Sequence, residues 1–117
     1  MKVMMAMDKQ NSLFVDFFGD YPLIRVLDFL IENDVFDYSK KDISRNADVS
    51  WNTLETFWKN LEETGVVAYT RKVGRASMYK INRANPIVKH LIELDAKLMK
   101  KSMEKLEPKK EKVKALA

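Results

Sequence analysis

The 117-residue sequence predicts a mainly α-helical fold with one small antiparallel β-hairpin. Three observations predict it. Apolar residues recur at helical spacing in several segments, the period changes to strand-like alternation across residues 66–81, and a glycine, Gly74, interrupts that alternating stretch. The length suits one small domain with an appended element, because single domains commonly contain about 100–150 residues.

The first predicted helix covers residues 12–18, "SLFVDFF". Its aromatic face is expected to pack against the core or a second subunit, and a ligand pocket is the less favoured alternative. We expect Asp20 to cap a second helix, which has Pro22 in its first turn. The apolar residues of these two segments are Leu13, Phe14, Phe17 and Phe18, followed by Leu23, Val26, Leu27, Leu30 and Ile31.

Two further helices are predicted on either side of a tight turn. After the break at residues 33–34, "VFDY" is expected to form a short extended piece, and Ser39 then caps the helix "KKDISRNA". Asp48 and Val49 form the turn, and Ser50 caps a helix that runs to Thr64 and stops at Gly65.

The remaining elements are the hairpin and a long last helix. "VVAYTRKV" and "SMYKI" alternate on either side of "GRA", which predicts two strands joined by a turn. Pro86 opens the long helix, and we expect the order to end near Pro108. The last helix carries an apolar stripe at residues Ile87, Leu91, Leu94 and Leu98.

This order of elements is that of a winged helix-turn-helix. Residues 40–81 resemble the winged helix-turn-helix of bacterial and archaeal transcriptional regulators of the ArsR and MarR type. They begin with "KKDISRNADVSWNTLETFWKNLEETG" and continue through the hairpin. The resemblance covers about residues 22–98. From the residues and this resemblance together we expect a helical extension at 1–19, a DNA-binding domain at 20–85, a dimerisation helix at 86–107 and a flexible basic tail at 108–117.

The resemblance also implies that the second helix of the pair enters the major groove of double-stranded DNA. At about 100° per residue, its apolar residues share one arc and its polar residues lie opposite. A plain solvated helix face is the alternative. The residues expected to contact bases are Asn52, Thr53, Thr56, Lys59 and Asn60, and those expected at the helix edge or the DNA backbone are Ser50, Trp51, Lys40 and Lys41.

Positive charge is concentrated in the second half of the chain. Residues 1–70 hold 7 Lys and Arg against 12 Asp and Glu, whereas residues 71–117 hold 14 against 5. Such polarity suggests contact with a polyanion, although a solvated lysine-rich tail and a solubilising hairpin edge are plainer explanations. The wing cations expected on phosphates are Arg71, Lys72, Arg75 and Lys80, and Arg75 is also placed to enter a minor groove.

The long last helix is expected to form a homodimer, because its apolar stripe extends past what one small domain covers. The alternative is that it folds back on "SLFVDFF" within one chain. We expect either constitutive binding controlled by the protein's own abundance or a small effector, of unknown identity, lodged at the dimer interface. The residues expected to mediate dimerisation are Leu13, Phe17, Ile87, Leu91, Leu94 and Leu98.

Several classes of function are not expected. The chain has no Cys and a single His, His90, so we expect no metal site, no cofactor and no enzyme activity. No signal peptide or membrane span is recognisable, and we expect a cytoplasmic protein. Two alternatives stay open: a protein-interaction module, suggested by Trp51, Glu55, Glu62 and Glu63, and a replication or plasmid-maintenance factor that binds DNA.

Overall fold

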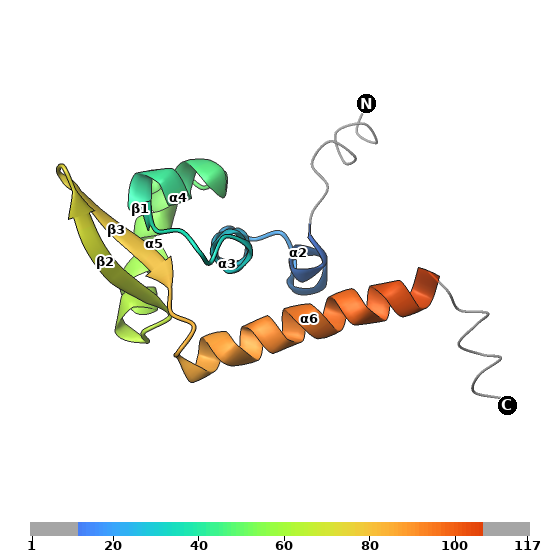
Figure 1. Cartoon of the computed structure of the whole chain (residues 1–117). Helices are drawn as coiled ribbons and strands as arrows, with labels where there is room; N and C mark the ends of the chain where they lie inside the picture. The colour runs from blue at the N-terminus through green and yellow to red at the C-terminus, as the bar shows by residue number, and fades with distance from the viewer. Residues whose placement is uncertain (1–11, 107–117) are drawn as a thin grey trace, which may run out of the picture.

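The computed structural model describes residues 12–106, and it confirms a mainly helical fold with a small antiparallel sheet (Figure 1). The predicted segment before residue 12 and the predicted tail at 108–117 lie outside the described residues. The elements in chain order are α2 (Leu13–Phe18), α3 (Pro22–Glu32), β1 (Tyr38–Ser39), α4 (Lys40–Asn46), α5 (Trp51–Glu63), β2 (Val67–Val73), β3 (Ala76–Ile81) and α6 (Pro86–Leu106).

One apolar core joins all of these helices. It contains Phe14 from α2, Leu30 from α3, Ile43 from α4, Trp58 from α5 and Val88 from α6. The predicted apolar arc of α5 is confirmed, because its buried residues repeat at helical spacing. Asn and Thr side chains on the opposite side of α5 are therefore left facing solvent.

Helix capping matches the prediction at two positions and differs at a third. The hydroxyls of Ser39 and Ser50 accept hydrogen bonds from the third backbone N–H after them, at 3.1 and 3.2 Å. The expectation that Asp20 caps α3 is wrong. Tyr21 is the N-cap residue and makes no side-chain cap bond, while Asp20 forms an ion pair with Arg25 at 2.9 Å.

The hairpin is the wing, and it belongs to a three-stranded sheet with the order β1-β3-β2. The predicted extended piece contributes only the two residues of β1, which pair with Met78 and Tyr79 of β3. Val73 pairs with Ala76, so the turn holds two residues. Gly74 has φ 60 and no other residue of this turn has a positive φ, which is the pattern of a II′ turn with glycine first.

A joint of asparagine side chains holds the end of α5 against the start of α6. The Asn82 amide donates to the carbonyl of Gly65 at 3.1 Å, and the Asn85 amide donates to the carbonyl of Thr64 at 2.9 Å. The Asn85 side-chain oxygen also accepts from the backbone N–H of Ile87 at 2.8 Å, so the same residue caps α6. The direction of α6 is thereby fixed relative to α5.

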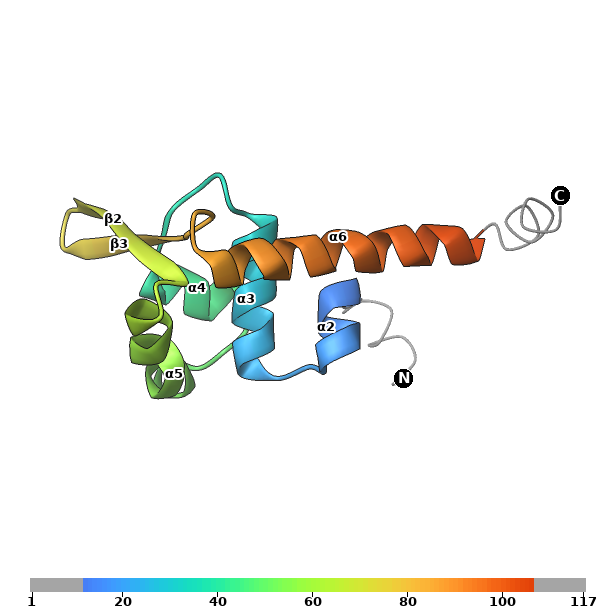
Figure 2. The ribbon, with the colours of Figure 1, turned by 90° about the horizontal axis from the view of Figure 1, so that it is seen from below.

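Helix α6 begins near the sheet, crosses α3, passes α2 and then extends away from the wing, as both ribbon views show (Figure 2). Val88 is fully buried, and Leu91 packs against the same core. The chain therefore contains the folded-back contact with α2 that the sequence left open as an alternative to dimerisation. Within residues 12–106, no helix is long and apolar enough to cross a membrane.

Candidate nucleic-acid interface

The outer face of α5 is polar and carries few free charges. Asn52, Thr56, Lys59 and Asn60 are exposed, and Thr53 is half-buried. Lys59 lies 3.9 Å from Glu63 on the next turn, an exposed pair that contributes little. The structure thus brings the five predicted base-contacting side chains to one surface of the helix.

Two of these side chains already have partners within α5. The Ser50 hydroxyl donates to the Thr53 hydroxyl at 2.9 Å, and the Thr56 hydroxyl donates to the Thr53 carbonyl at 2.5 Å. Thr56 therefore presents its methyl group more readily than its O–H, and a methyl group suits contact with thymine. Asn52 and Asn60 have no side-chain hydrogen bond within residues 12–106, so their amides are free to pair.

Arg25 holds the turn between α4 and α5. Its guanidinium donates to the carbonyls of Ala47 and Asp48 at 3.0 and 2.9 Å while pairing with Asp20. Asp48 has φ 57, a left-handed conformation that Asp tolerates better than most residues. The sequence reasoning missed Arg25 because its partners lie 22 and 23 residues away, beyond any local pattern.

Lys40, which is expected at the DNA backbone, has partners within the protein. Its ammonium lies 2.7 Å from the Glu55 carboxylate and over the rings of Trp51 and Trp58, at 5.1 and 5.6 Å from their centroids. Its side chain is only 21% exposed. Lys40 is thus already engaged within the protein, and it offsets the carboxylate that would otherwise repel a phosphate.

The wing cations fall into two groups. Arg71 is held by Asp37, whereas Lys72 and Arg75 near the tip are exposed and have no ion pair within the described part of the chain. Lys80 is half-buried on β3. Lys41, at the start of α4, is exposed and also lacks an ion pair among residues 12–106. Among the cations predicted to contact DNA, those available to a polyanion are therefore at the wing tip and on α4.

Asp37 fixes the base of the wing. Its carboxylate accepts from the Thr70 hydroxyl at 2.6 Å and from two guanidinium nitrogens of Arg71 at 2.9 and 3.1 Å. Consecutive strand residues normally point to opposite faces, but the register shifts between Tyr69 and Arg71, and this bulge lets both side chains reach one carboxylate. The hydrogen bonds from Arg71 and Thr70 lower the pKa of Asp37 well below its usual range.

We predict that Asp37→Asn loosens the wing and releases Arg71. Amide hydrogen exchange across β2 should accelerate at neutral pH, because a neutral amide replaces the carboxylate that accepts all three bonds. In the unmodified protein the carboxylate's contribution is fully present above the unfolded pKa of about 3.9, and it is lost as the pH falls toward the lowered folded value.

The matched control for this exchange experiment is Asp34→Asn. Asp34 pairs with Arg83 at 3.1 Å, so this variant removes an equivalent charge from a pair that does not touch β2. Exchange in β2 should stay unchanged in the control. Equal acceleration in both variants would show that general charge loss, and not the bond network at Asp37, governs the wing.

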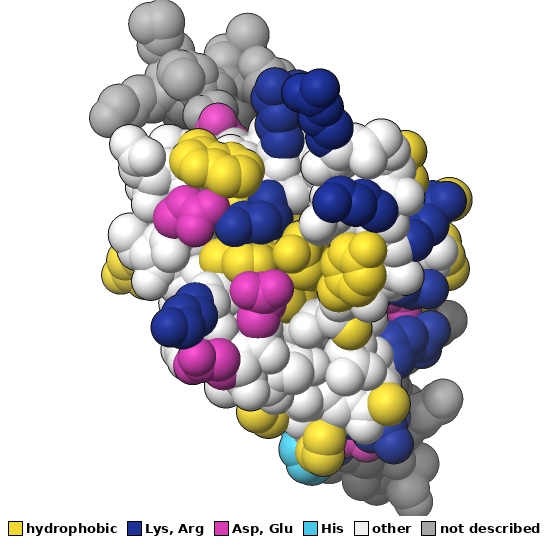
Figure 3. Space-filling model, turned by 90° about the vertical axis from the view of Figure 1, so that its left-hand side faces the viewer, with side chains coloured by type: hydrophobic (Ala, Val, Ile, Leu, Met, Phe, Trp, Pro, Cys, Tyr) yellow, Lys and Arg dark blue, Asp and Glu magenta, His cyan; other side chains and the backbone are white. Residues whose placement is uncertain are grey.

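The wing tip, the start of α4 and the start of α5 line one hollow of about 340 Å³. Figure 3 views this side of the molecule and shows hydrophobic side chains near the centre of the face, with Lys and Arg around them and Asp and Glu between. Both predicted binding elements therefore contribute to one surface. The hollow is lined by Ser39, Lys40, Lys41, Trp51, Arg75, Ala76, Ser77 and Tyr79.

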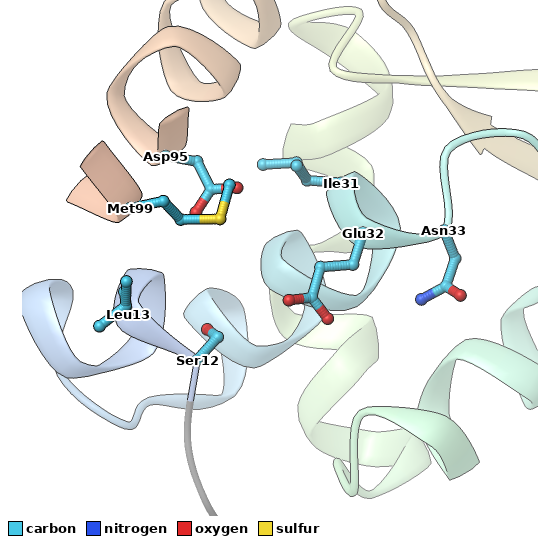
Figure 4. A pocket seen from close by; sticks show the side chains of 7 residues that line it. All are labelled: Ser12, Leu13, Ile31, Glu32, Asn33, Asp95 and Met99. Atoms are coloured by element: carbon cyan, nitrogen blue, oxygen red, sulfur yellow. The ribbon is translucent and has the colours of Figure 1, made fainter. Parts of the chain in front are cut away.

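A larger hollow of about 550 Å³ lies between α2, α3 and α6, where Asp95 and Met99 project from α6 (Figure 4). Its wall includes the carboxylates of Glu32 and Asp95. Burial raises the pKa of Asp95, and burial together with nearby Asp28 and Asp95 raises the pKa of Glu32. Carboxylates repel phosphate, so this hollow is not part of the surface available to a nucleic acid.

The elements define the class of fold as a winged helix-turn-helix. No family model and no curated protein sequence matches the chain. A similar solved structure is the crystal structure of Sso10a-2, a DNA-binding protein from Sulfolobus solfataricus, with 17% identity, a TM-score of 0.47 and coverage of 79% of this chain and 92% of that chain. At this identity and score the likeness adds nothing to the assignment, which rests on the elements of the chain itself.

Proposed function

We propose that the chain is a cytoplasmic, homodimeric transcriptional regulator, of the same kind as ArsR- and MarR-type regulators, that binds specific sequences in double-stranded DNA. Helix α5 enters the major groove and the wing contacts the backbone or the minor groove. The observation that carries the proposal is the hollow lined by the start of α4, the start of α5 and the wing tip. It brings the helix proposed to enter the major groove onto one surface with the cations Lys41 and Arg75, which have no ion pair among the described residues.

The outer face of α5 suits base recognition by its chemistry. A major groove about 12 Å wide admits one helix and presents a distinct pattern of donors and acceptors for each base pair. Asn52 and Asn60 offer amides suited to adenine, and Thr56 offers a methyl group suited to thymine. Because this face carries little net charge, α5 would recognise the base sequence, and most of the attraction to phosphates would come from cations outside α5.

The phosphate attraction is assigned to Lys41, Lys72 and Arg75. Each is exposed and lacks an ion pair within the described residues. Arg71 and Lys40, which the sequence also suggested, are engaged by Asp37 and Glu55. The proposal therefore places fewer cations on DNA than the sequence implies, and places them at the wing tip and on α4.

Selection of bound duplexes from a random pool, followed by native mass measurement of the complex, tests this function. We expect a palindromic consensus with half-sites about 34 Å apart and two chains per duplex. Asn52→Ala should relax the consensus at one position in each half-site, whereas Arg75→Ala should weaken all sequences alike and make the salt dependence shallower.

Absence of duplex binding at low salt would overturn the proposal, because every phosphate contact strengthens as salt falls. Binding without a consensus would retain DNA binding but overturn sequence specificity. A consensus found only near replication origins would favour the replication or plasmid-maintenance alternative. The same selection therefore separates these possibilities.

The protein-interaction alternative gains no support from Glu55. That carboxylate was one reason to doubt a DNA surface, but its ion pair with Lys40 offsets its charge. Glu62 and Glu63 are exposed in the last turn of α5, and Glu63 lies near Lys59. Burial and the nearby Glu62 carboxylate raise the pKa of Tyr79, which lines the hollow, so Glu62 adds some negative charge beside that surface.

The proposed dimer uses the outer parts of α2 and α6. Leu91 packs inward and Leu94 is half-buried, so they contribute less to an interface than the sequence suggested. Leu13, Phe17 and Leu98 line a surface groove of about 270 Å³ between the two helices. Met99 and Met103 are further exposed apolar residues of α6, and Ile87 is a separate exposed residue at its start.

We predict that Phe17→Glu combined with Met103→Glu dissociates the dimer. The dimer dissociation constant, measured by sedimentation equilibrium, should rise about 100-fold or more, because each unpaired carboxylate buried in an interface costs well over 1 kcal/mol.

The control for this dimer experiment is Phe36→Glu combined with Val35→Glu. The exposed fractions match, at 61% and 62% for the two phenylalanines and 68% and 67% for Met103 and Val35. Both pairs add the same charge, but the control pair lies in the turn before β1. A dimer that survives the first pair, or is lost in both, would contradict the proposed interface.

A further inference from the structure

Trp51 stands half-exposed, at 47%, in the centre of the proposed DNA-binding surface. Single exposed apolar residues are common and need no explanation. Trp51 differs from them because its ring is held in place. The Lys40 ammonium lies over the ring at 5.1 Å, and Lys40 is itself fixed by Glu55 at 2.7 Å and by the buried ring of Trp58 at 5.6 Å. The ring is therefore ordered before any ligand arrives, which lowers the entropy lost on binding.

Open space borders this ring in two directions. Trp51 lines the hollow of about 340 Å³ that it shares with Lys40 and the wing tip. It also lines a second hollow of about 530 Å³, whose other walls are Lys41, Ser44 and Arg45. Both volumes fall within the range of about 300–1,000 Å³ that is typical of small-molecule sites. A planar ligand therefore has room beside the ring.

Cations surround the ring on the same surface. Lys41 lines both hollows, Arg75 lines the first and Arg45 the second. Arg45 has Asp42 at 3.8 Å as its ion-pair partner among the described residues, and its side chain is 70% exposed, so its charge is largely available. An ordered aromatic ring among free cations is the combination by which proteins hold a nucleobase together with its flanking phosphates.

The faces of bases in an intact duplex are covered by their neighbours, so a helix in the major groove meets only base edges, methyl groups and backbone. A ring can stack only on a base that has left the duplex stack. We propose that Trp51 is a stacking site for an unpaired nucleobase, with Lys41, Arg45 and Arg75 contacting the adjoining phosphates. This inference rests on the proposed function, since it assumes that the same surface binds nucleic acid.

Binding of three probes of identical sequence tests the inference: an intact duplex, the same duplex with one unpaired 2-aminopurine, and the single strand containing 2-aminopurine. Stacking on an aromatic residue contributes about 1–3 kcal/mol per base, so the unmodified protein should prefer the bulged duplex to the intact one by about tenfold or more. The fluorescence of 2-aminopurine should be quenched on binding. Tight binding of the single strand would show that the stacked base comes from single-stranded DNA. Preference for the bulged duplex would show that it is a base displaced from a duplex.

Variants of Trp51 then assign the effect to the ring. Trp51→Phe should retain part of the preference and the quenching, whereas Trp51→Leu should lose both and bind the bulged and the intact duplex about equally. Tyr21→Leu removes an aromatic residue that is more exposed than Trp51, 65% against 47%, from the loop before α3, and should change nothing.

Equal loss of affinity for intact and bulged duplexes in Trp51→Leu would overturn the inference, since the ring would then contact backbone only. An unmodified protein that binds the intact duplex without preferring either unpaired probe would also overturn it while leaving the proposed function in place. Failure to bind any probe, the intact duplex included, would overturn both.

Discussion

Replacing Trp58 with alanine is expected to lower the free energy of unfolding by about 3–5 kcal/mol, which is a large fraction of the roughly 5–15 kcal/mol that stabilises most domains. Trp58 is 2% exposed, and its ring packs edge-on against Tyr79 at 5.1 Å between centroids. Truncation leaves a cavity where α5 meets the sheet, and it also removes one ring that supports Lys40. Urea unfolding followed by far-ultraviolet circular dichroism measures the loss.

The same substitution at Trp51 is the matched control. Trp51 lies seven residues earlier on the same helix and is 47% exposed, so Trp51→Ala should cost no more than about 1 kcal/mol, mainly its interaction with Lys40. Comparable losses from the two variants would mean that Trp51 belongs to the core, which would also remove the basis for a stacking role.

Reversal of the two wing-tip cations, Lys72→Glu with Arg75→Glu, is expected to weaken duplex binding near 0.1 M salt by about 100-fold for each bound chain, or about 10⁴-fold for a dimer. Each phosphate contact contributes about 0.9 to the slope of log affinity against log salt, which corresponds to roughly tenfold per contact at this concentration. The salt slope should become shallower by about 2 for each bound chain, or about 4 for a dimer. Titration of a labelled duplex at several salt concentrations measures both quantities.

Lys89→Glu with Lys97→Glu is the control for charge. Both lysines are exposed on α6 and lack an ion pair within the described residues, and this variant reduces the net charge of the chain by the same amount. Its affinity and slope should change little if local contacts matter. A similar loss in both variants would show that net charge alone governs binding. Arg71→Ala should have a smaller effect than Arg75→Ala, because Asp37 already holds Arg71.

The sequence predicts the elements well because each has a local signal. Ser39 and Ser50 are capping residues, Gly74 suits a tight turn, and the apolar spacing of α5 separates its buried side from its outer side. Asn52 and Thr56 are exposed for that reason. Their expected roles on bases are not tested by the fold and stay predictions.

The contacts that decide which cations are free have no local signal. Lys40 pairs with Glu55 across 15 residues, and Arg71 pairs with Asp37 across 34. A sequence shows that these charges exist but not which of them neutralise one another. Asp20 was misassigned for a related reason: a cap residue and an ion-pair partner of Arg25 have the same chemistry, and only the path of the chain distinguishes them.

The asparagine joint at Asn82 and Asn85 has a consequence for any two-chain complex built through α6. Both side-chain amides donate to carbonyls just after α5, and the Asn85 oxygen accepts from the Ile87 N–H of α6, so hydrogen bonds join the two helices across the hairpin that separates them in the chain. In a dimer joined along α6, the angle and the distance between the two α5 helices would therefore be fixed. Two half-sites would then be recognised only at one separation, and the protein would measure distance along DNA as well as base sequence.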